Sequence, residues 1–172
     1  MARGLRYRLV GDRPGTRRIP AAVLVLVSVF WPLALLGAPR TGMDGPGSPA
    51  SYGLASGVYV LGSRVCHQRS DRSFHVRGVQ FPVCARCLGL YVAAPFGVVG
   101  ALVASRRRRP LMPDGPAWRW ALVAAALPTA ATLAWEGISP GTVSGAVRAG
   151  AGAPLGFALG ALAAVASVGK SG

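Results

Sequence analysis

An all-α membrane protein, built as a bundle of four transmembrane helices, is the fold that the sequence predicts. The first observation is composition, because 52% of the residues are apolar and only 14% are charged, which is too apolar for an ordinary soluble domain. The second is that four apolar stretches are long enough, at about 1.5 Å per residue, to cross roughly 30 Å of hydrocarbon. They cover residues 19–36, 88–105, 117–135 and 143–168. We therefore expect one membrane domain, residues 19–172, behind a basic cytoplasmic N-terminal segment, residues 1–18.

The first stretch begins after Arg17 and Arg18, as the apolar core of a secretory signal peptide also would. It is longer than a typical signal core, and the residues that follow it, Gly-Ala-Pro-Arg at 37–40, make a poor cleavage site. We expect a retained span. The second stretch contains Pro95 and ends before the arginines at 106–109.

Tryptophans mark both ends of the third stretch, at Trp118, Trp120 and Trp135. Indole rings favour the wet interface of a bilayer, so these positions fit the two ends of a span. Pro128 lies inside the stretch, where neighbouring helices or water can satisfy the carbonyl that a proline leaves free.

The fourth stretch is rich in small residues. Gly152, Gly156 and Gly160 recur every four residues and therefore share one helix face. Small residues let another helix approach closely in lipid, where van der Waals packing drives association. This face predicts a packing seam, and a homo-oligomer through the three glycines is one use of it.

Arginine placement predicts the orientation, because positively charged flanks stay in the cytoplasm. Basic residues gather before the first stretch, between the second and third, and after the fourth, at Lys170. Both termini are then cytoplasmic, and the loop at residues 37–87 is extracytoplasmic. That loop has arginines of its own, but long loops weigh less than short flanks in setting topology. We expect a multi-pass protein of the cell membrane in which Arg106, Arg107, Arg108 and Arg109 also contact anionic lipid.

A net charge of +14 raises nucleic acid as a partner. The charge is spread along the edges of the spans and includes no recognition motif, so we expect no such partner. The sequence also has no Ser-His-Asp order and no paired carboxylates that would indicate hydrolysis. A non-enzymatic role therefore has more support than an enzymatic one.

The long loop divides into two parts. Residues 41–51 are rich in Gly, Pro and Ser and should be irregular. Residues 52–65 are apolar but too short to cross, and Leu54, Val58 and Leu61 recur at helical spacing. We expect a short helix, interfacial or re-entrant, that brings Cys66 towards the bundle.

One segment after this helix holds all the cysteines and histidines of the chain. Cys84 and Cys87 are separated by two residues, a spacing at which two thiolates bind one metal ion or close a disulfide. Cys66 and His67 lie upstream and complete a tetrahedral zinc ligand set of three sulfurs and one nitrogen. His75 is the alternative fourth ligand. The sequence therefore predicts a metal site, with zinc as its ion.

We expect a second layer of residues around that site, formed by Gln68, Arg72, Arg86 and His75. Nearby guanidinium groups lower thiol pKa values and donate hydrogen bonds to thiolates. Both effects suit a metal site and a redox site alike.

Two other functions remain open for this segment. A membrane thiol-disulfide oxidoreductase would use Cys84 and Cys87 as its redox pair and Cys66 as the exchange partner, and an inert disulfide is the plainest alternative. A transporter for a small anion, lined by the arginines, has the least support, because the spans contain almost no polar residues.

Three short motifs carry a family resemblance: Cys-His-Gln at 66–68, Arg-Ser-Phe at 72–74 and Pro-Val-Cys-Ala-Arg-Cys-Leu-Gly-Leu-Tyr at 82–91. They resemble the domain-of-unknown-function 2085 family of small prokaryotic predicted membrane proteins. Trp-Glu-Gly at 135–137 and the Arg- and Gly-rich element from Arg148 are similar to that family's later motifs, with Glu136 where the family usually has Asp and Ala151 where it has Thr. The resemblance implies a membrane topology and a Cys/His motif but no reaction.

Glu136 and Arg148 stand at facing ends of the third and fourth stretches. Ionisable groups near a bilayer are costly and are usually paired or functional. An ion pair that closes the short turn between the two spans is one expectation, and two solvated interface charges are the other.

Overall fold

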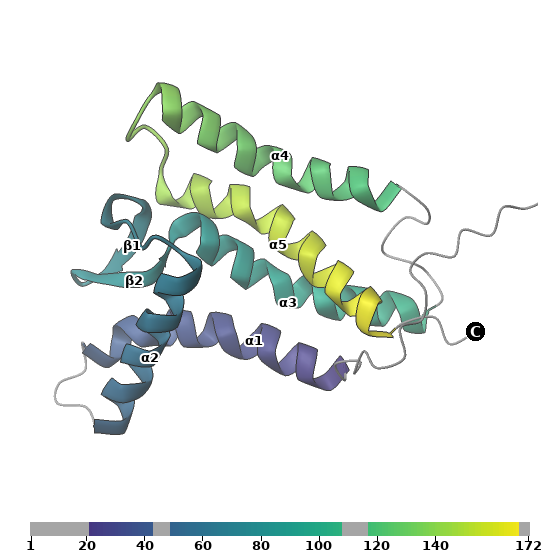
Figure 1. Cartoon of the computed structure of the whole chain (residues 1–172), viewed down its shortest axis with the longest axis horizontal. Coiled ribbons are helices and arrows are strands. Elements are labelled where there is room, and N and C mark those ends of the chain that lie inside the picture. Colours follow the sequence, from purple (N-terminus) through teal and green to yellow (C-terminus); the bar gives the residue numbers. More distant parts are fainter. Residues whose placement is uncertain (1–20, 43–48, 108–116, 169–172) are drawn as a thin grey trace, which may run out of the picture.

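Four long helices run side by side in the computed structural model, which describes residues 21–42, 49–107 and 117–168 (Figure 1). They are α1 (Ala21–Gly37), α3 (Ala85–Arg106), α4 (Ala117–Ile138) and α5 (Gly145–Val168). All four, α1 with the turn that follows it, are long and apolar enough to cross a membrane. The predicted fold class, an all-α membrane protein with four spans, is confirmed. The predicted N-terminal segment, Lys170, Arg108 and Arg109 lie outside the described residues.

Two helix boundaries differ from the prediction in ways that matter for the site. α3 begins at Ala85 and not at residue 88, so Cys87 lies in its first turn and Cys84 is the residue that precedes it. α4 continues to Ile138, so Glu136 is helical. Apolarity alone placed these ends too far inside the spans, because Cys, Arg and Glu interrupt the apolar pattern without interrupting the helix.

The predicted short helix is α2 (Pro49–Val65), which lies at a steep angle to α1 at one end of the four-helix group (Figure 1). After it come a short 3₁₀ turn, η2 (Ser70–Arg72), and an antiparallel hairpin of β1 (Ser73–Val76) and β2 (Val79–Cys84). The hairpin turns at Arg77 and Gly78, which both have positive φ angles, 49° and 83°. Two such residues form the type I′ turn that matches the twist of paired strands. No sequence pattern predicted this hairpin.

A small core joins the hairpin to α1 and α3. Leu35, Phe81, Val83 and Leu88 are its buried side chains, and Cys66 and Cys87 pack against it. The β2 side chains are buried on both faces near the strand's end, which is typical of a strand covered on both sides. The core therefore places β2 and the start of α3 together.

The glycines of the fourth span pack against α3 within the same chain. A Cβ atom added at Gly152, Gly156 or Gly160 would collide with the backbone of Arg86, Leu90 or Ala94, respectively. A Cβ atom added at Gly89 or Gly97 of α3 would likewise collide with the backbone of α5. The predicted packing seam is confirmed, and its partner is α3. The predicted contact between two copies through these glycines has no room here, because α3 already occupies that face.

Candidate functional site

Three thiols meet where α2, β2 and α3 converge. The Sγ atoms of Cys66, Cys84 and Cys87 all lie within 4.8 Å of one another. Cys66 directly follows α2, Cys84 ends β2, and Cys87 lies in the first turn of α3. All three are free and half-buried. We call this group the thiol centre.

The start of α3 explains why its two cysteines face one way. Cys84 has extended backbone angles and precedes the first helical residue, so Cys84 and Cys87 are separated by about one helical turn and project to one side. The backbone N–H of Cys84 donates a hydrogen bond to the Cys66 sulfur at 3.2 Å. The third thiol is therefore held by the same turn that presents the other two.

Gln68 fixes the segment that carries Cys66. Its Nε2 donates to the carbonyl of Tyr59 at 2.8 Å, on α2, and to the carbonyl of Pro82 at 2.7 Å, on β2. Its own carbonyl accepts a hydrogen bond from Gln80 Nε2 at 2.6 Å. Gln68 has a φ angle of 48°, which turns the chain back after Cys66. The residue therefore joins the two elements that deliver Cys66 and Cys84.

Neither histidine joins the thiol centre. His67 is exposed next to the half-buried Cys66, because adjacent side chains project in different directions. His75 is exposed on β1, and its Nε2 lies 3.4 Å from Ser70 Oγ. The chain's three cysteines and two histidines all fall within the described residues. The structure thus gathers three of the four predicted ligands, Cys66, Cys84 and Cys87, and leaves out His67 and the alternative His75.

Hydrogen bonds lower the pKa of the Cys84 thiol below its ordinary value. The side chain of Cys87 is the strongest of these partners, and the backbone of Cys87 and the side chain of Cys66 add to it. Burial opposes the shift but does not cancel it. A thiolate is the form that binds a metal or attacks a disulfide, so this shift favours the form of Cys84 that either reaction needs.

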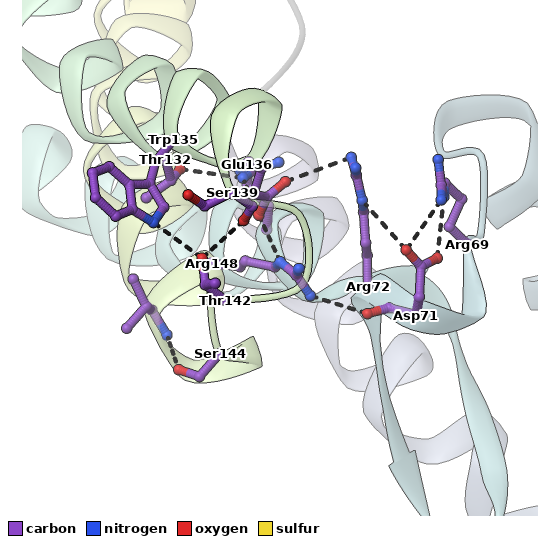
Figure 2. A network of polar contacts seen from close by, with 12 residues as sticks. Arg69, Asp71, Arg72, Thr132, Trp135, Glu136, Ser139, Thr142, Ser144 and Arg148 are labelled. Atoms are coloured by element: carbon purple, nitrogen blue, oxygen red, sulfur yellow. Dashed lines mark hydrogen bonds and ion pairs between the residues drawn. The ribbon is translucent and has the colours of Figure 1, made fainter.

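A second polar group surrounds Glu136, at the end of α4 (Figure 2). Arg148 Nε donates to Glu136 Oε1 at 2.7 Å, and Arg86 Nη2 donates to the same oxygen at 3.1 Å. Arg72 Nη1 lies 3.5 Å from Oε2. The side chains of Glu136 and Arg148 are only 3% and 8% exposed. We call these four residues the Glu136 cluster, and they include the predicted pair of Glu136 with Arg148 in its ion-paired form.

The Glu136 cluster extends to the 3₁₀ turn η2, which precedes the hairpin. Arg148 Nη1 donates to the backbone carbonyl of Asp71 at 3.1 Å, and the Asp71 carboxylate pairs with Arg69 at 3.1 Å. The Arg69 hydrogen bond is the main reason that the pKa of Asp71 lies below its ordinary value. Figure 2 shows Asp71 and Arg72 facing the ends of α4 and α5. The turn η2, which precedes the hairpin, is thus tied to α4 by the Arg72–Glu136 ion pair and to α5 by the Arg148–Asp71 hydrogen bond.

Arg86 connects the two groups, a connection that no sequence pattern predicted. It stands between Cys84 and Cys87, but its guanidinium donates to Glu136 and to Thr132 Oγ1 at 3.2 Å, both on α4. We expected Arg72 and Arg86 beside the sulfurs. Both side chains contact Glu136 instead, which lies 50 or more residues away in the sequence. No local pattern encodes such a contact.

Comparison with known proteins agrees with this architecture. The family described as predicted membrane protein (DUF2085) matches residues 66–162, a segment that contains the thiol centre and the Glu136 cluster. No solved structure matches the chain.

Two archaeal relatives are similar over shorter segments. An uncharacterised protein of Methanocaldococcus jannaschii is 32% identical over 77 residues, which are 45% of this chain and 49% of the relative. An uncharacterised protein of Methanothermobacter thermautotrophicus is 50% identical over 30 residues, which are 17% of this chain and 27% of the relative. The match therefore spans half or less of either relative. Because the family match covers more than half of the chain, the chain belongs to the DUF2085 family of predicted membrane proteins.

Proposed function

We propose that the protein binds a thiophilic metal ion, zinc before others, through Cys66, Cys84 and Cys87. The observation that carries the proposal is the approach of the three sulfurs to within 4.8 Å of one another. Tetrahedral zinc holds sulfur at about 2.3 Å, which separates two of its sulfur ligands by roughly 3.8 Å. The three thiols therefore need only a small contraction to fit the ion. Soft thiolate ligands also favour zinc and copper(I) over magnesium or calcium.

The fourth position of the proposed site is open to a ligand from outside the chain, and His67 could fill it only by turning its exposed ring towards the sulfurs. Structural zinc sites are usually closed by four protein ligands, whereas reactive ones keep one position for water or substrate. Three thiolates around a divalent ion carry one net negative charge. The Cys84 N–H that donates to the Cys66 sulfur offsets part of it.

The proposed orientation places this site on the extracytoplasmic side of the bilayer. α3 has Cys87 in its first turn and Arg106 in its last turn, so the thiol centre and the arginines lie at opposite ends of one span. The positive-inside rule assigns the arginine end to the cytoplasm. Both termini are then cytoplasmic, and Arg106 and Arg107 lie where anionic lipid would meet them.

Metal content of protein purified in detergent tests the proposal. We expect about one equivalent of zinc per chain in the wild type, since the three sulfurs form one site. Cys84→Ser should lose it, because a hydroxyl is a poor substitute for a thiolate. His75→Ala is the matched control and should keep the metal, since His75 lies outside the thiol centre. A wild-type protein that stays free of metal after loading with zinc would refute the proposal.

Thiol-disulfide exchange is the second candidate, and the low pKa of Cys84 next to a free Cys87 supports it. In that reaction the Cys84 thiolate attacks a substrate disulfide, and Cys87 then attacks the mixed disulfide and releases the reduced substrate. Alkylation trapping in intact cells distinguishes the candidates. A trapped Cys84–Cys87 disulfide in metal-free protein would favour exchange, whereas three reduced thiols with bound metal would exclude it.

A further inference from the structure

We propose that Glu136 is a positioning residue for the thiol centre and that it acts through Arg86. The inference rests on the proposed metal site and adds to it a residue 49 positions beyond Cys87 that pairs with arginines. Residues that do not bind a metal themselves can still orient its ligands, by holding the segment that carries those ligands.

Arg86 is fixed at both its ends. Its backbone carbonyl packs so closely against Gly152 of α5 that a Cβ atom there would collide with it. Its guanidinium, on a side chain only 13% exposed, is held by Glu136 Oε1 and Thr132 Oγ1 of α4. A residue restrained at backbone and side chain fixes the direction of its neighbours, and here the neighbours are Cys84, Ala85 and Cys87.

Glu136 is the part of this arrangement that has no substitute. It is the one buried residue of α4 within the described chain, and its carboxylate pairs with guanidinium groups from three separate segments. Removal of one partner from a buried charged group leaves the others uncompensated. Without the carboxylate, the guanidinium groups of Arg86, Arg148 and Arg72 would repel one another, and Arg86 would leave its position.

The test measures zinc affinity by chelator competition and the cobalt(II)-thiolate absorption spectrum in Glu136→Gln. The amide keeps the size of the side chain but loses its charge. We expect affinity to fall by about 10- to 100-fold, the range found when partners of metal ligands are changed, with a shift of the cobalt bands. Arg86 Nη2 makes both bonds to α4, and a lysine side chain is one bond shorter, so its ammonium stops short of that position. Arg86→Lys should therefore reproduce both effects.

Thr129→Val is the matched control, because Thr129 Oγ1 donates to the Ala151 carbonyl at 2.7 Å and so joins α4 to α5 without touching Arg86. It should lower stability but leave the affinity and the cobalt spectrum unchanged. Equal losses in Thr129→Val and Glu136→Gln would overturn the inference, since they would reflect general loosening of α4. The inference would also be overturned if Glu136→Gln and Arg86→Lys fold and keep the zinc affinity and the cobalt spectrum of the wild type.

A metal-free measurement separates this inference from the proposed function. In protein stripped of metal, Glu136→Gln and Arg86→Lys should raise the alkylation rate of the half-buried thiols severalfold, while Thr129→Val should not. If the wild type binds no metal but the rates change in this way, the metal proposal fails and Glu136 keeps its positioning role. If the rates do not change, the positioning role fails regardless of metal.

Discussion

At the scale of single residues, the site depends on side chains that bond to backbone groups of other elements. Gln68 is the clearest case, since its amide joins the carbonyls of Tyr59 and Pro82 across α2 and β2. Cys66 lies two residues before it, and Cys84 lies two residues after Pro82. The thiols are brought together by a residue that is itself no ligand.

Gln68→Ala should therefore weaken metal binding as well as the fold. The change removes two hydrogen bonds, and each contributes about 1 kcal/mol net, so the free energy of unfolding should fall by roughly 2 kcal/mol. Gln and Ala both bear the cost of the left-handed backbone at this position, so the comparison isolates the side chain. Denaturant titration in detergent and chelator competition are the measurements.

Ser63→Ala is the control for Gln68→Ala. Ser63 is exposed on α2, and its hydroxyl donates to the Val60 carbonyl of its own helix. Loss of this hydroxyl should leave the free energy of unfolding and the metal affinity nearly unchanged. Wild-type affinity in Gln68→Ala would show that α2 and β2 hold the thiols without it.

At the scale of elements, α3 and α5 form the tightest pair. Glycines occur at the points where the two backbones meet, and each lacks room for a methyl group. Close backbone approach is a principal source of helix association in lipid. The close packing of α3 on α5 therefore holds in place the start of α3, where two of the thiols lie.

Gly156→Ala and Gly150→Ala make a matched test on one helix. A Cβ atom at Gly156 would meet the Leu90 backbone, whereas a Cβ atom at Gly150 would meet nothing within 4 Å. Gly156→Ala should destabilise the protein by about 1–3 kcal/mol, as overpacking does. Gly150→Ala should be neutral or stabilising by up to about 1 kcal/mol, because alanine is the better helix former. Equal thermal stability of the two variants would contradict the seam.

The sequence predicted the elements with strong local signals and missed those without them. Four spans follow from apolar length, and the seam follows from the spacing of Gly152, Gly156 and Gly160. The hairpin was missed because its strands are short and carry His75 and Gln80 among apolar residues. The exposed position of His67 and the contact of Arg86 with Glu136 depend on tertiary packing, to which no local pattern points.

At the scale of the whole molecule, the thiol centre lies at one end of the helices and the Arg106 end of α3 at the other (Figure 1). α1 packs on α3, α3 on α5, and α5 on α4. Four apolar helices place the molecule in a bilayer. In the proposed orientation, the thiol centre lies on the extracytoplasmic side of the bilayer and the Arg106 end of α3 lies on the cytoplasmic side.

Thiol labelling in intact cells tests that orientation. After metal is stripped, an impermeant maleimide should modify the native cysteines from outside the cell. In a variant with all three cysteines replaced by serine, a new thiol at Arg107→Cys should react only after the cells are permeabilised. The opposite pattern would reverse the topology without affecting the metal proposal.

The α3–α5 seam also limits how this protein can move. If either helix slid along the other by one residue, the glycines would leave the points where the two helices cross. Larger residues would take their places, and their side chains would collide with the backbone of the other helix. The pair is therefore fixed in register and moves as one body. A change of conformation would then have to move α1 or α4 relative to this pair, and a movement of α4 would have to part the bonds that Thr129 and Glu136 make with α5.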